Sequence, residues 1–110
     1  MKHLVLGLLA AAGLSAAQAQ DTQTFTGTIS DDMCALGGHA QMRMGPTDAE
    51  CARLCVTIHG GAFVLDNGTN AYTLSDQTLS EKFAAQKVRV TGTLDPKTKI
   101  IQVRSIAAAD

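Results

Sequence analysis

The residues that could do chemistry are concentrated in one stretch of the chain, residues 33–55. This stretch reads MCALGGHAQMRMGPTDAECARLC and contains all three cysteines and three of the four methionines, with one histidine among them. Thiols, thioethers and imidazoles bind soft and borderline transition metals, and two thiols can instead form a disulfide. The sequence therefore offers two chemistries for this stretch, a disulfide and a metal site.

A disulfide is the simpler expectation. Cys51 and Cys55 are one helical turn apart, which puts their Cβ atoms about 5–6 Å from each other, whereas a disulfide needs about 3.8 Å. We therefore expect Cys34 to pair with one of them, and the spacing leaves open which one. The bond would close a loop of roughly 16–20 residues and stabilise the fold by about 3 kcal/mol through loop-closure entropy.

A metal site is the alternative. Four potential ligands follow the spacing C-x4-H-x11-C-x3-C, namely Cys34, His39, Cys51 and Cys55. Four ligands of these types suit tetrahedral zinc. The same stretch adds the thioethers of Met33, Met42 and Met44. Because sets of Cys, Met and His favour copper, we place copper ahead of zinc as the expected cofactor.

Thiol redox activity is a third and weaker hypothesis. Redox-active thiols of the thioredoxin type use C-x-x-C at the start of a helix, whereas the pair here is C-x-x-x-C. Asp31 and Asp32 are explained by a turn that ends a strand, and His59 by the end of a helix, where an imidazolium is favoured. We therefore expect no catalytic residue and no enzymatic activity.

Residues 1–19 are typical of a Sec-type signal peptide. Lys2 gives the start a positive charge, residues 4–14 are apolar apart from glycine, and Ala17-Gln18-Ala19 is an A-x-A cleavage site. The apolar run is too short for a membrane-spanning helix. We expect cleavage near Ala19–Gln20 and a periplasmic or secreted protein.

The composition of the remaining chain argues against two classes of partner. Removing Lys2 leaves eight basic and ten acidic residues, a formal charge of −2, and the chain has no Trp, one Tyr and three Phe. Nucleic-acid binders cluster Lys and Arg and expose aromatic side chains for stacking. We therefore expect neither nucleic acid nor a membrane span, and an unknown protein or small ligand as partner.

The rest of the chain reads as a small β-barrel in one domain, residues 20–110. Alternating or compact apolar patterns predict five strands, at residues 24–29, 62–65, 71–74, 87–94 and 100–106. Capping boxes predict helices that start at Thr47 and at Thr78, and Gly60 ends the first of them. In the first helix, one apolar face is expected to carry Cys51, Leu54, Cys55 and Ile58. This order predicts a mainly β, five-stranded OB-like barrel with two short helices and an insertion at about 31–60; a two-layer α+β sheet is the alternative.

Several motifs also resemble an uncharacterised family of small exported bacterial OB-like proteins. The matching segments are ISDxMC at 29–34 with a following His39, ECxxxCV at 50–56, GGA at 60–62, YxL at 72–74 and KVxVTGTL at 87–94. They cover nearly all of the chain after the signal peptide. The resemblance implies export and the OB-like fold, and it carries over no catalytic residue.

Together these patterns predict an exported, non-enzymatic binding or envelope-interaction module, stapled by a disulfide from Cys34 to Cys51 or Cys55. The alternatives are a periplasmic protein that binds copper or, second, zinc, and a thiol redox protein.

Overall fold

Strand β1 (Gln23–Asp31) is shared by the two sides of the barrel in the computed structural model, which describes residues 21–39 and 43–109. Its first part, Gln23 to Thr28, pairs antiparallel with β4 (Lys87–Asp95). Its last part, Thr28 to Asp31, pairs antiparallel with β2 (Phe63–Asp66). The passage from one partner to the other occurs beside Gly27, where a Cβ atom would lie 2.6 Å from the Asp66 carbonyl oxygen. Glycine inside a strand often marks such a close approach of another backbone.

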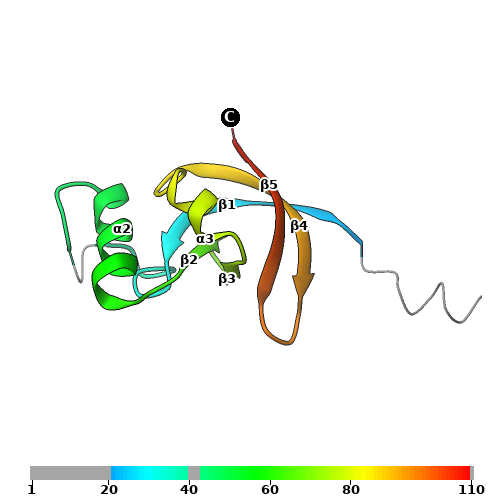
Figure 1. Cartoon of the computed structure of the whole chain (residues 1–110), viewed down its shortest axis with the longest axis horizontal. Helices are drawn as coiled ribbons and strands as arrows, with labels where there is room; N and C mark the ends of the chain where they lie inside the picture. The colour runs from blue at the N-terminus through cyan, green and yellow to red at the C-terminus, as the bar shows by residue number, and fades with distance from the viewer. Residues whose placement is uncertain (1–20, 40–42, 110) are drawn as a thin grey trace, which may run out of the picture.

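The remaining strands close the sheet into a ring (Figure 1). β2 pairs antiparallel with β3 (Ala71–Leu74), and β3 pairs parallel with the start of β5 (Ile100–Ala108). β5 pairs antiparallel along β4, which completes the order β1-β2-β3-β5-β4. The predicted five-stranded OB-like barrel is confirmed, and the chain does not adopt the alternative of a two-layer sheet.

Helix α2 (Asp48–His59) fills the insertion between β1 and β2, as predicted. The side chain of Thr47 accepts a hydrogen bond from the Glu50 N–H at 3.2 Å, and Gly60 ends the helix in the left-handed conformation at φ 71°. The buried positions of α2 stop at Cys55, and Ile58 in the last turn is 63% exposed. The prediction that Ile58 faces the core is wrong, because the buried face ends one turn before it.

Helix α3 (Gln77–Glu81) lies between β3 and β4. Its N-cap is Asp76, whose Oδ1 accepts from the Leu79 N–H at 2.9 Å. The prediction of Thr78 as the N-cap is wrong. Asp76, two residues before Thr78, already accepts a hydrogen bond from an unpaired N–H group of the first turn, so the helix begins earlier.

The barrel interior is apolar. Its largest buried side chains are Ile29, Phe63, Leu65, Leu74, Val88, Val90 and Ile101. The three cysteines with Met44 form a second buried cluster outside this core. In Figure 1, α2 lies at one end of the molecule, beside the end of β1 and away from the β4–β5 hairpin. The insertion therefore has its own small core, which consists of sulfur-containing side chains.

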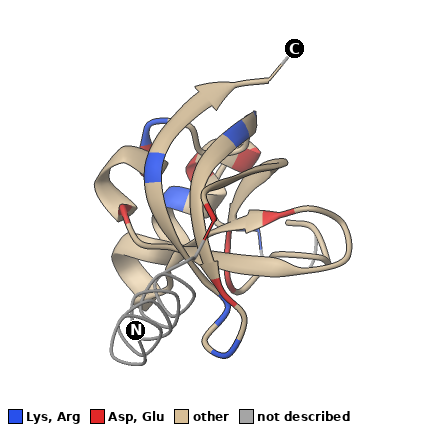
Figure 2. Cartoon of the chain, turned by 90° about the vertical axis from the view of Figure 1, so that its right-hand side faces the viewer, with Lys and Arg blue, Asp and Glu red and all other residues tan. Residues whose placement is uncertain are grey.

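Charged residues are spread over the molecule. In Figure 2, Lys and Arg positions lie on several strands and loops, with Asp and Glu among them. Within residues 21–39 and 43–109, neither helix has the length and hydropathy that crossing a membrane would require. The signal peptide predicted at residues 1–19 lies outside the described residues and stays a prediction.

Candidate metal centre

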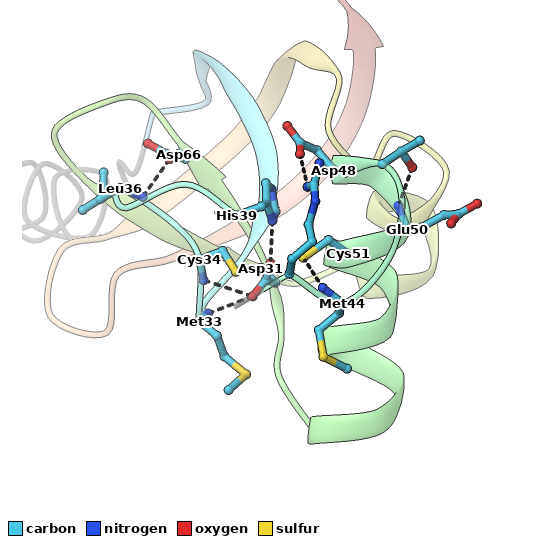
Figure 3. Close-up of polar contacts among 12 residues, drawn as sticks. Asp31, Met33, Cys34, Leu36, His39, Met44, Asp48, Glu50, Cys51 and Asp66 are labelled. Carbon is cyan, nitrogen blue, oxygen red and sulfur yellow. Dashed lines mark hydrogen bonds and ion pairs between the residues drawn. The ribbon is translucent and has the colours of Figure 1, made fainter. Parts of the chain in front are cut away.

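The cysteine cluster forms where the turn after β1 meets α2 (Figure 3). Cys34 comes from the turn, and Cys51 and Cys55 come from successive turns of the helix. Cys51 and Cys55 have no exposed surface, and Cys34 is 4% exposed. Cys51 and Cys55 lie on the buried face of α2, and this face packs against the turn after β1 that carries Cys34.

Asp31 holds the turn that carries Cys34. Its Oδ2 accepts hydrogen bonds from the N–H groups of Met33 and Cys34 at 3.0 and 3.1 Å, and its carbonyl oxygen accepts from Ala35 at 2.9 Å. The side chain thus mimics a backbone turn, which is a common use of aspartate after a strand. These bonds fix the backbone of Cys34 in front of α2.

A second tether fixes the chain between Cys34 and His39. The Leu36 N–H donates to Asp66 Oδ2 at 2.9 Å, although the two residues are 30 positions apart in sequence. Leu36 has φ 68°, a left-handed conformation that bulky residues rarely adopt. This hydrogen bond therefore joins the turn to the end of β2. It also helps to hold Leu36 in a backbone conformation that leucine rarely adopts on its own.

The potential ligand atoms fall into two groups of three. The ligand atoms of Cys34, His39 and Cys51 all lie within 4.8 Å of one another, and so do those of Asp31, Cys34 and Cys55. Cys34 belongs to both groups. All four residues of the predicted C-x4-H-x11-C-x3-C set thus meet at one place. The three cysteines are present as thiols, so the disulfide from Cys34 to Cys51 or Cys55 stays a prediction.

Asp31 is a potential ligand that the sequence interpretation missed. It is fully buried, and its Oδ1 lies 3.9 Å from Nδ1 of His39. Neither atom has a hydrogen-bond partner within the part of the chain that the structure describes. Asp31 does form the predicted turn, but of its two side-chain oxygens only Oδ2 accepts hydrogen bonds there. The signal that could have located it is the alternation in β1, which puts Asp31 on the same face as Phe25 and Ile29.

The methionines are placed unequally. Met44 packs against the cysteines, and its N–H donates to Cys51 Sγ at 3.4 Å. Met33 is 47% exposed, and Figure 3 shows its thioether pointing away from Cys34. Met42 lies outside the described residues. Of the predicted thioether ligands, Met44 alone is described in contact with the cluster.

Burial and charge hold two of the thiols in the protonated form. Burial raises the pKa of Cys34 to about 12, with a further contribution from the neighbouring Asp31 carboxylate. The same two causes, in the same order, raise the pKa of Cys55 to about 11. A bound cation would reverse this effect, because it stabilises the thiolate and lowers the pKa of a coordinating thiol.

The donor types fit a transition metal. Thiolate sulfur, imidazole nitrogen and carboxylate oxygen are the three kinds of ligand that zinc accepts in proteins. Two buried atoms lack hydrogen bonds among the described residues, Asp31 Oδ1 and His39 Nδ1. They belong to side chains that each group with two of the sulfurs, and each atom could donate a lone pair to an ion. The residues present therefore fit such an ion in both chemistry and burial.

Comparisons with protein-family models, with curated proteins and with solved structures each find no match to this chain.

Proposed function

We propose that this protein is an exported, non-enzymatic binder of a transition-metal dication, zinc in the first place. The centre consists of Asp31, Cys34, His39, Cys51 and Cys55. The observation that carries the proposal is a pair of buried atoms, Asp31 Oδ1 and His39 Nδ1, that lack hydrogen-bond partners among the described residues and belong to side chains grouped with three cysteine sulfurs.

The energetics of burial support this proposal. A buried polar group without a partner costs about 1–3 kcal/mol, and more when it is charged. Asp31 has no exposed surface, so bulk water does not offset this cost. A cation at the centre would accept lone pairs from both orphaned atoms and balance the carboxylate charge. An ion at the centre would therefore supply a partner for both atoms.

The donor set favours zinc over copper. Copper(I) prefers sulfur, whereas zinc combines sulfur, nitrogen and oxygen ligands readily. Asp31 adds an oxygen to the set, and Met33 turns its thioether away. Copper is the second candidate ion, because Met44 packs against the three sulfurs and could add a fourth.

The second candidate function is a disulfide-stapled binding or envelope-interaction module. It is favoured by the approach of Cys34 Sγ to within 4.8 Å of both helical sulfurs, Cys51 Sγ and Cys55 Sγ. Thiol redox catalysis is less favoured, because reactive thiols have lowered pKa values, whereas the pKa values of Cys34 and Cys55 are raised.

Native mass spectrometry of protein purified from the periplasm without reductant tests the proposal. A stoichiometric zinc or copper adduct supports the metal centre, and the loss of two hydrogens without a metal supports the staple. His39→Ala should weaken zinc binding at least tenfold in a chelator competition. His59→Ala is the matched control, because His59 is exposed at the far end of α2. Equal affinity in the two variants would contradict the role of His39.

A further inference from the structure

The donors of the metal centre outnumber the ligands of one tetrahedral ion. Zinc in protein sites is almost always bound by four ligands. Here five residues supply donor atoms, arranged as the two groups described above, with Cys34 in both. Cys34 therefore belongs to two groups that each include one residue with an orphaned atom, His39 with Nδ1 in one and Asp31 with Oδ1 in the other.

We propose that the centre holds two dications bridged by the Cys34 thiolate. One ion binds Cys34, His39 and Cys51, and the other binds Asp31, Cys34 and Cys55. This inference rests on the proposed function, and it specifies the number of ions and the ligands of each.

The distance between the orphaned atoms permits this arrangement, because each atom can lie about 2.0–2.2 Å from an ion of its own. Ions in two-metal sites lie about 3.5–4 Å apart. Asp31 Oδ1 and His39 Nδ1 are 3.9 Å apart, too far for a hydrogen bond to each other. Two ions at the usual spacing could each take one of these atoms, while Cys34 Sγ remains within reach of both ions.

The charges of the donors suit two dications. When all three thiols bind as thiolates, they carry four negative charges together with the Asp31 carboxylate, and the His39 imidazole is neutral as a ligand. Two dications balance these charges, so no net charge is buried among Asp31, Cys51 and Cys55, which have no exposed surface.

Burial distinguishes the two positions. Asp31, Cys34 and Cys55 are all buried, whereas His39 in the other group is partly exposed. An ion at the His39 position can therefore exchange with solvent more readily, and the ion at the Asp31 position should leave last. The centre should load and unload in two steps.

The test is a titration of the reduced, metal-free mature chain with zinc, followed by native mass spectrometry and chelator competition. The wild type should bind two ions per chain. Cys55→Ala and His39→Ala should each bind one, because each removes a ligand of one ion and leaves the other group intact. Cobalt(II), titrated in place of zinc, should show thiolate charge-transfer absorption that breaks at one and again at two equivalents.

Asp31→Asn should also bind one ion, and Asp32→Asn is its matched control, because Asp32 is the neighbouring exposed carboxylate. Circular dichroism checks that each variant is folded; if Asp31→Asn loses its fold, Cys55→Ala carries the test. A wild type that saturates at one ion, or a Cys55→Ala that still binds two, overturns the bridged pair and leaves the proposed function standing. A wild type that binds no ion overturns both.

Discussion

The N–H of Leu36 donates to Asp66 Oδ2, and this bond joins the turn of the candidate metal centre to the end of β2. Asp66 also accepts from the Gly68 N–H through Oδ1 at 2.8 Å, so one carboxylate orders both the β2–β3 hairpin and the turn. Asp66 has no place among the proposed ligands. It acts on the centre as a positioning residue.

Asp66→Ala should therefore weaken zinc binding about tenfold, the lower end of the range for residues that orient metal ligands. Asp66→Asn keeps one acceptor oxygen and should recover part of the affinity. Chelator competition measures both, and thermal melts of the metal-free proteins check that the barrel is retained. Equal affinity of Asp66→Ala and the wild type would show that the turn holds its shape without the tether.

The raised thiol pKa values predict how the stability of the reduced, metal-free protein depends on pH. The pKa is about 12 for Cys34 and about 11 for Cys55, against the ordinary value of 9.0. The unfolded chain thus loses these protons at lower pH than the folded chain does. The contribution of the two protonated thiols to the free energy of unfolding is fully present below about pH 9 and is lost as the pH rises toward 11–12. The melting temperature should fall across that window.

The matched variants for this measurement are Cys34→Ser and Cys55→Ala. Each removes one shifted group, so each should show a shallower fall of the melting temperature above pH 9 than the wild type. Alkylation by iodoacetamide gives a second readout, because only the thiolate reacts. Rapid alkylation of folded, metal-free protein at pH 8 would contradict the raised pKa values.

Gly27 should tolerate no side chain. Gly27→Ala places a methyl group 2.6 Å from the Asp66 carbonyl oxygen, so β1 and β2 must separate. The expected loss is about 1–3 kcal/mol of unfolding free energy, as for other overpacked sites. Gly37→Ala is the control, because among the described residues no atom other than those of its chain neighbours lies within 4 Å of the added methyl group. Similar denaturation midpoints for the two variants would refute the close approach.

Lys99 offers a stabilising substitution. It has φ 59° in the turn between β4 and β5, a conformation that glycine adopts without steric cost. Lys99→Gly should raise the unfolding free energy by roughly 0.5–1 kcal/mol, since relief of strain outweighs the extra entropy of the unfolded chain. Lys97→Gly in the same turn should give no gain. Urea denaturation of the two variants tests this prediction, and equal unfolding free energies for Lys99→Gly and Lys97→Gly would contradict it.

Local patterns in the sequence predicted most of the fold. Thr47 and Gly60 bound α2 as expected, because capping depends on residues only a few positions apart. The five strands follow from alternation and turn residues, which are also local. The two errors, Ile58 and the Thr78 cap, concern where a buried face or a first turn ends. Tertiary packing and competing caps decide such boundaries.

The candidate site was predictable in composition and only partly in geometry. The spacing identified Cys34, His39, Cys51 and Cys55, and the structure brings them together. It did not identify Asp31, because a strand-ending turn already explained that residue. Nor could it give the path from Cys34 to His39, which depends on Asp66 in a distant strand. Contacts between residues 30 positions apart leave no local signature.

The sharing of β1 has a mechanical consequence. The strand pairs with β4 over its first part and with β2 over its last part, so it connects these two strands in the ring. Asp31 is the last residue of β1. An ion bound to Asp31 would hold this end of β1 in place, and the amides of β1 and β2 would exchange their hydrogens with solvent more slowly as the ion binds.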